Sequence, residues 1–146
     1  MILELLATMC AAIFSGAAIY INLVEHPARM SLGPATALAE WRPAYERGAR
    51  MQAPLALVGL ITAIAAWATG ASAAWLVGGV LLGAVVPFTL LVTSRVNKQL
   101  MDPGTASDPA RARVLLERWN RLHAVRSTLS LTALVLFLSL LTWARS

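Results

Sequence analysis

Four long apolar stretches, separated by polar segments, organise the sequence. A bilayer core about 30 Å thick needs about 20 apolar residues in a helix that rises 1.5 Å per residue. Each stretch is close to that length, and none alternates apolar and polar positions as a barrel strand does. The pattern therefore predicts one all-α domain over residues 1–146, an up-down-up-down four-helix transmembrane bundle. Its helices are expected at about residues 3–25, 52–70, 73–97 and 109–144.

The composition is that of an integral membrane protein. Hydrophobic residues make up 58% of the chain and charged residues 13%, whereas soluble domains carry about 25% charged residues. The mean hydropathy is +0.68. No basic residue precedes the first apolar stretch, so we expect a retained helix there and not a secretory signal. The single Cys10 is expected to be a buried thiol.

Basic residues are distributed unequally between the two sides of the predicted bundle. Of the 12 Lys and Arg residues, only Arg145 lies on the side of the termini. Because loops rich in Lys and Arg stay in the cytoplasm, we expect both long loops inside and both termini outside the inner (plasma) membrane. This asymmetry accounts for the net charge of +5 and predicts contact with anionic lipid headgroups, with no need for nucleic acid.

The first cytoplasmic loop is expected to contain a short helix over residues 35–41 that lies in the membrane interface. Two interpretations of this segment are open. Trp41 and the nearby Tyr45 would anchor it among the lipid headgroups, or the segment would form a lid over a site.

Particular residues predict the shape of the last two helices. Pro87 should kink the third helix near Gly83. Gly79 and Gly83 form a GxxxG pair that permits close helix packing, within the bundle or in a homo-oligomer. Asp108, followed by a proline, is a helix N-cap, so the last helix should begin well before the bilayer and extend into the cytoplasm.

Polar residues gather where the predicted helices reach the cytoplasmic boundary. Helical spacing places Trp119, His123 and Arg126 on one face. Since alternating topology brings four helix ends to one depth, we expect these side chains to converge on one pocket; the alternative is that each is an ordinary interfacial residue. The expected set is Asn22, Glu25, His26, Gln52, Asn97, Trp119, Asn120, His123 and Arg126.

Several motifs resemble those of the small four-helix membrane proteins grouped as the anthrone oxygenase family. They are VEHPARM at 24–30, EWRP at 40–43 with Tyr45 and Arg47-Gly48, MQAP at 51–54, VNK at 96–98 and WNRLHAVR at 119–126. The resemblance covers nearly the whole chain. It implies a membrane-embedded oxygenase that oxidises anthrones to anthraquinones. It also implies a shared polar set of His26, Asn97, Trp119, His123 and Arg126.

The chemistry follows from the acidity of a benzylic C–H group. A neutral His123 would remove the proton, Arg126 or Asn97 would stabilise the enolate oxygen, and the anion would react with O₂ without a cofactor. His26 is a second catalytic candidate. The substrate should be an apolar aromatic or lipid-like molecule that arrives from the bilayer. The expected substrate-binding residues are Trp119, Asn120, Asn22, Gln52, Trp41 and Tyr45.

Other hypotheses use the same residues. A metal-assisted oxygenase would bind its ion through His26, His123 and Glu25, two imidazoles and a carboxylate. A non-catalytic membrane module would instead bind a lipid, a quinone or a partner helix in the pocket. A small transporter is less favoured, because the sequence has neither a run of intramembrane charges nor a pair of broken helices.

Overall fold

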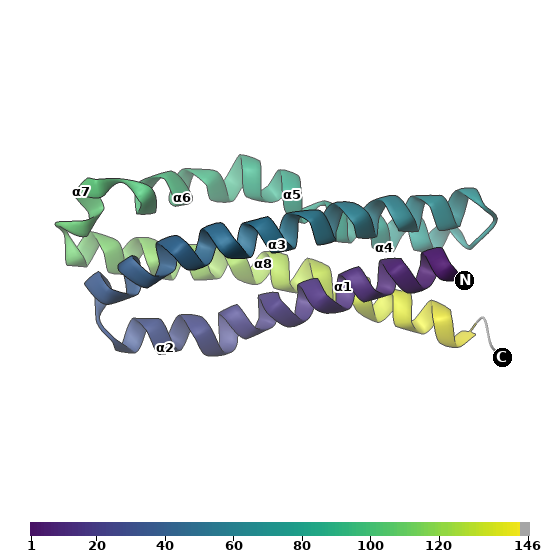
Figure 1. Ribbon diagram of the computed structural model, residues 1–146, viewed down its shortest axis with the longest axis horizontal. Coiled ribbons are helices and arrows are strands. Elements are labelled where there is room, and N and C mark those ends of the chain that lie inside the picture. The colour runs from purple at the N-terminus through teal and green to yellow at the C-terminus, as the bar shows by residue number, and fades with distance from the viewer. Residues whose placement is uncertain (144–146) are drawn as a thin grey trace.

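The computed structural model describes residues 1–143 and is all-helical over that range. Four segments are long and apolar enough to cross a membrane. Figure 1 shows them as an antiparallel bundle in which the N-terminus, the end of the last helix and the turn between the second and third spans lie together. The predicted four-helix transmembrane bundle is therefore confirmed. The spans are Ile2–Ser31, Pro34–Ala68, Ala73–Met101 and Pro109–Trp143.

The first span continues beyond its predicted end at about residue 25. It consists of α1 (Ile2–Tyr20), the π-helical turn η1 (Ile21–Glu25) and α2 (His26–Ser31). Pro27 lies in the first turn of α2, directly after the π-helical turn. The π-helical turn contains Asn22 and Glu25, and such turns are frequent at functional sites.

The second span is one helix, α3 (Pro34–Ala68), of 35 residues. The prediction of a separate interfacial helix over residues 35–41 is therefore wrong. The helix of the second span begins at Pro34, far before the predicted residue 52. Trp41 has no exposed surface, so it packs inside the bundle and does not anchor among headgroups. Its burial stabilises the polar first half of α3. At 1.5 Å per residue the helix is about 50 Å long, so this half extends beyond the hydrocarbon core.

The third span is interrupted after Gly83, where Pro87 predicts a kink. It consists of α4 (Ala73–Gly83), α5 (Val85–Phe88), the π-helical turn η2 (Thr89–Thr93) and α6 (Ser94–Met101). Pro87 has no N–H to donate to the Gly83 carbonyl, and its ring crowds that group. In Figure 1 α5 and α6 are displaced from the line of α4.

The last span is α8 (Pro109–Trp143), which follows the short α7 (Pro103–Ala106). The backbone N–H of Arg111 donates to Asp108 Oδ1 at 3.0 Å, so the predicted N-cap is confirmed. The predicted last residue of this helix, Ala144, and the basic Arg145 lie outside the described residues.

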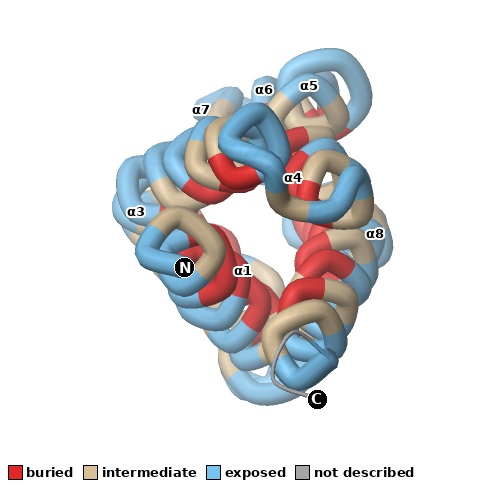
Figure 2. Tube along the Cα trace, turned by 90° about the vertical axis from the view of Figure 1, so that its right-hand side faces the viewer, coloured by how far each residue is buried: buried red, intermediate tan, exposed pale blue. Residues whose placement is uncertain are grey.

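Two clusters of buried side chains hold the spans together, and Figure 2 shows the buried residues facing inward. One lies at membrane depth, where Trp75 stacks on Phe137 with ring centroids 4.9 Å apart. The other surrounds Trp41 and Trp119. A Cβ on Gly79 would lie 2.7 Å from the Cβ of Ala63. The GxxxG face is therefore occupied by contacts within the chain, between α3 and α4.

Candidate functional site

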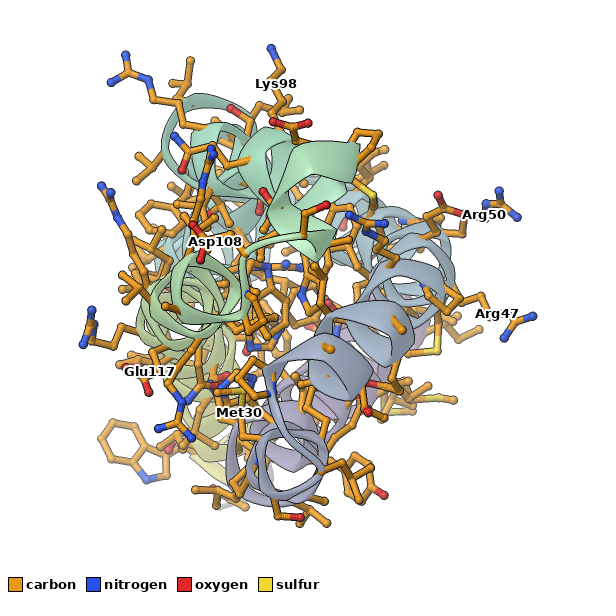
Figure 3. The ribbon with its side chains drawn as sticks, turned by 90° about the vertical axis from the view of Figure 1, so that its left-hand side faces the viewer. Met30, Arg47, Arg50, Lys98, Asp108 and Glu117 are labelled. Atoms are coloured by element: carbon orange, nitrogen blue, oxygen red, sulfur yellow. The ribbon has the colours of Figure 1, made fainter. Side chains whose placement is uncertain are left out.

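The site lies at the basic end of the bundle, defined as the end formed by α2, the first half of α3, α6, α7 and the start of α8. Figure 3 looks onto this end and shows Arg47, Arg50 and Lys98 pointing outward, away from the bundle. A second set of polar side chains at this end faces inward. All four spans contribute to it, since Asn22, Gln52, Asn97 and His123 come from different spans and each has a polar contact described below.

His123 is almost completely buried, with 1% of its surface exposed, and its ring is fixed by Asn22. The Asn22 amide donates to the backbone oxygen of Asn120 at 3.1 Å and to its Oδ1 at 2.7 Å. Asn22 Oδ1 lies 3.1 Å from His123 Nδ1 and accepts a hydrogen bond from the Ser127 hydroxyl at 2.5 Å. Because that oxygen can only accept, Nδ1 carries the ring proton and Nε2 keeps its lone pair.

Arg126 lies one turn further along α8 and is also buried, with 8% exposed. Its Nη2 donates to Gln52 Oε1 at 2.8 Å, and its guanidinium carbon lies 5.6 Å from the centroid of the Phe14 ring. Arg126 Nε and Gln52 Nε2 have no hydrogen-bond partner among the described residues. The site therefore holds a cation with free donor capacity.

Trp119 packs near both histidines. Its ring centroid is 4.9 Å from that of His123 and 6.1 Å from that of His26. Trp41 meets it edge-on at 5.7 Å and also stacks on Tyr45 at 5.0 Å. The indole of Trp119 thus contacts both imidazoles, and Trp41 supports the aromatic side chains around the site from within the core.

Asn97 supports Tyr45, which lies on another span. The Asn97 amide donates to the Tyr45 hydroxyl oxygen at 2.9 Å. Tyr45 lines a cavity that Asn97 does not line. Of the two residues expected to stabilise an enolate, Arg126 is therefore the one that reaches the cavity, and Asn97 positions a neighbour.

Arg29 is a buried charge that the sequence reasoning did not assign to the site. Its guanidinium forms ion pairs with Glu25 and, at 2.6 Å, with Glu40. It also lies 6.0 Å from the centroid of the Trp119 ring. The spacing of four residues between Glu25 and Arg29 could have predicted the first pair, whereas the contact with Glu40 depends on how α2 packs on α3.

The geometry does not support the proposed metal ligands. Among residues 1–143, no three His, Cys, Asp or Glu side chains form a group that could hold a metal ion. Glu25 pairs with Arg29, and the Trp119 ring contacts both His26 and His123. The set of His26, His123 and Glu25 therefore does not fit a metal ion.

Two adjoining cavities meet at Arg126. The polar cavity, about 20 Å³, has room for about one water molecule and is lined by Glu25, Arg29, Tyr45, Gln52, Trp119, His123 and Arg126 with small residues of α3. The apolar chamber, about 170 Å³, is lined by Phe14, Tyr45, Ala49, Ala53, Val85, Val86, Thr89, Leu90 and Arg126. Tyr45, Ala49 and Arg126 line both cavities. A molecule in the chamber would therefore lie next to the polar groups.

Comparison with known proteins adds a family to this geometry. The family model described as anthrone oxygenase matches residues 41–136, about two thirds of the chain. The chain belongs to the anthrone oxygenase family. The resemblance inferred from the sequence motifs is thus confirmed. No curated protein and no solved structure matches the chain significantly.

The match to the anthrone oxygenase family includes most of the site. It covers Trp41, Tyr45, Gln52, Asn97, Trp119, Asn120, His123 and Arg126. It begins after the first span, which supplies Asn22, Glu25 and His26. In this member of the family, the first span supplies the partner that fixes the orientation of His123.

The structure brings most of the candidate residues into one region, but through contacts that their spacing along the chain did not predict. His26 does not line the polar cavity, and Asn22 and Asn120 act beside it by holding the His123 ring. Ser127 was not assigned to the site, although it donates to Asn22. Its position four residues after His123 was the signal that could have identified it.

Proposed function

We propose that this protein is a membrane oxygenase that deprotonates an apolar aromatic substrate where the apolar chamber adjoins the polar cavity, and lets the resulting anion react with O₂. The observation that carries this proposal is that His123 and Arg126 line the same cavity. One offers a lone pair to a proton, and the other offers a positive charge to an oxyanion. The family name supports anthrones as the substrates to test.

His123 acts as the general base through Nε2. Its Nδ1–H is directed to Asn22 Oδ1, so Nε2 is the nitrogen available to the cavity. Because the ring is held from Asn22 and packed against Trp119, it needs no reorientation before proton transfer. A positioned general base accelerates such a step by about 10²–10⁴-fold.

Arg126 stabilises the oxyanion that forms when the proton leaves. Its guanidinium has a free Nε–H in a region from which most water is excluded. Charge-assisted hydrogen bonds are strong in such surroundings. Gln52 holds the guanidinium at Nη2, and Arg126 lines the cavity, so its remaining N–H groups would serve the substrate.

The reaction balances with O₂ as the oxidant and no cofactor. For an anthrone, the benzylic C–H bond breaks, the proton goes to Nε2, and the carbonyl oxygen becomes an enolate oxygen. The benzylic carbon then forms a bond with O₂, and the imidazolium returns the proton to the outer peroxide oxygen. Loss of the second benzylic proton with cleavage of the O–O bond gives the quinone carbonyl and one water molecule.

The test compares the two histidines in purified protein in nanodiscs, measuring oxygen consumption and quinone formation from an anthrone. We expect His123→Gln to lower kcat/KM by about 10²-fold or more, whereas the matched variant His26→Gln should keep most of the activity because His26 does not line the polar cavity. Wild-type protein that is no faster than empty nanodiscs would contradict the proposal and favour a non-catalytic binding module.

We further propose that the basic end faces the cytoplasm of a cell whose plasma membrane holds the bundle. The positive-inside rule supports this orientation. In a Cys10→Ser background, Arg47→Cys should react with an impermeant maleimide only from the cytoplasmic side. Ser72→Cys, in the turn before α4, should react only from the opposite side, and the reverse pattern would refute the orientation.

A further inference from the structure

The two buried arginines of the basic end differ in how their charges are balanced. Arg29 forms ion pairs with two carboxylates, those of Glu25 and Glu40. Arg126 is as deeply buried but forms no ion pair with any carboxylate among residues 1–143. Its contacts are with neutral groups, the Gln52 amide and the Phe14 ring. An unbalanced charge at membrane depth is costly and usually functional.

Arg126 lines an apolar space. The chamber is lined by Phe14 of α1, Ala49 and Ala53 of α3, and Val85, Val86 and Leu90 of the broken third span. Leu90 is 66% exposed on the outer surface of the bundle. The break at Ala84 displaces α5 and η2 from the line of α4 (Figure 1). The chamber therefore lies between α3 and the displaced part of the third span, where bilayer molecules have lateral access.

We propose that the apolar chamber is a binding site for aromatic anions, in which a carboxylate or phenolate oxygen pairs with Arg126 and the ring lies among the apolar residues. The negative charge of the ligand would balance the positive charge of Arg126, which no carboxylate among residues 1–143 pairs with. A cavity of about 150 Å³ is known to accommodate benzene, so a chamber of about 170 Å³ holds one aromatic ring. Further rings extend through the gap toward the lipid.

This proposal shares Arg126 with the proposed function but does not depend on it. The oxygenase needs Arg126 to stabilise an anion formed during the reaction. The binding site needs it to select a ligand that is already an anion. A ligand without an acidic C–H group tests the second property alone.

The experiment measures binding of 2-naphthoate and of its neutral isostere 2-naphthamide by equilibrium dialysis at neutral pH. The protein is held in zwitterionic-lipid nanodiscs, and empty nanodiscs provide the blank. A hydrogen bond to a charged group corresponds to roughly a tenfold to hundredfold difference in Kd, so we expect 2-naphthoate to bind more tightly by that factor. Equal affinities for the two probes would overturn the proposal.

Two pairs of variants locate the binding. Arg126→Gln should abolish the preference for the anion, while Arg121→Gln, which removes an exposed charge from the same helix, should retain it. Ala53→Phe should weaken binding of 2-naphthoate by filling the chamber. Leu57→Phe is its control, since Leu57 is exposed one turn along α3 and does not line the chamber.

The outcomes separate the two proposals. If Arg126→Gln does not fold, Ala53→Phe still tests the site. Unchanged binding of 2-naphthoate to Ala53→Phe would show that the anion binds outside the chamber. A preference that survives in folded Arg126→Gln would also overturn the site. His123→Gln should bind 2-naphthoate like the wild type. Binding of 2-naphthoate without turnover of anthrones would therefore refute the oxygenase alone, and turnover without selective binding would refute the anion site alone.

Discussion

Replacing Gly79 with alanine should destabilise the bundle, because α3 and α4 approach closely at this residue. The added Cβ would lie 2.7 Å from the Cβ of Ala63 and 3.5 Å from the backbone oxygen of Leu60. Carbon atoms pack best at about 3.5–4.0 Å, so the helices would have to separate by about 1 Å. Overpacking of this kind costs about 1–3 kcal/mol. Alanine recovers up to about 1 kcal/mol of the helix penalty of glycine, which leaves a net loss of about 0.5–2 kcal/mol.

Two further variants make the measurement specific to this contact. Gly16→Ala introduces the same methyl group where nothing lies within 4 Å, so it should leave stability unchanged or raise it by up to about 1 kcal/mol. Ala63→Gly, combined with Gly79→Ala, removes the methyl group that the new Cβ would meet. The double variant should therefore be more stable than additivity of the two single variants predicts.

The assay is unfolding of the detergent-solubilised protein by SDS, followed by far-ultraviolet circular dichroism. The free energies of unfolding of the wild type, the single variants and the double variant give the interaction energy between positions 63 and 79. Additive effects, or a Gly79→Ala variant as stable as Gly16→Ala, would refute the packing of α4 on α3.

Two other predictions concern the basic end. Asn22→Leu should lower kcat with anthrone by about tenfold to hundredfold, because the His123 ring would lose the contact that orients it. KM should stay nearly constant, because Asn22 does not line the polar cavity. An unchanged kcat in steady-state kinetics would contradict this. Arg29→Leu should lower the free energy of unfolding by about 1–3 kcal/mol, less than for a fully buried pair, because Glu25 and Glu40 are partly exposed. Arg113→Leu, from an exposed pair, should change it by less than about 0.5 kcal/mol, and equal losses would refute the role of Arg29.

The spans could be predicted from the sequence because hydropathy and length suffice for them. Pro87 also predicted the kink in the third span, and Asp108 the start of the last helix, through local backbone chemistry. The continuous α3 could not be predicted in this way. Its first half is polar and contains Pro43, and what stabilises it is tertiary, the burial of Leu38 and Trp41 against the other spans.

The site was predictable as a region but not as a set of contacts. Antiparallel topology alone brings the polar ends of four spans to one depth. Which side chains pair depends on the rotation of each helix about its own axis, as for His123 with Asn22 and Arg126 with Gln52. The apolar residues are spread over most faces of each helix, so their pattern does not determine this rotation. The apolar chamber depends on the displacement of α5, and local sequence gives the break but not its direction.

The most direct test of the oxygenase account isolates the proton transfer from the reaction with O₂. Under nitrogen, an anthrone deuterated at the benzylic carbon is incubated with the protein in nanodiscs, and loss of deuterium to solvent is followed by mass spectrometry. We expect the wild type and His26→Gln to accelerate this exchange over empty nanodiscs, and His123→Gln not to do so. Exchange by His123→Gln at the wild-type rate, or no acceleration by the wild type, would contradict the assignment of His123 Nε2 as the base.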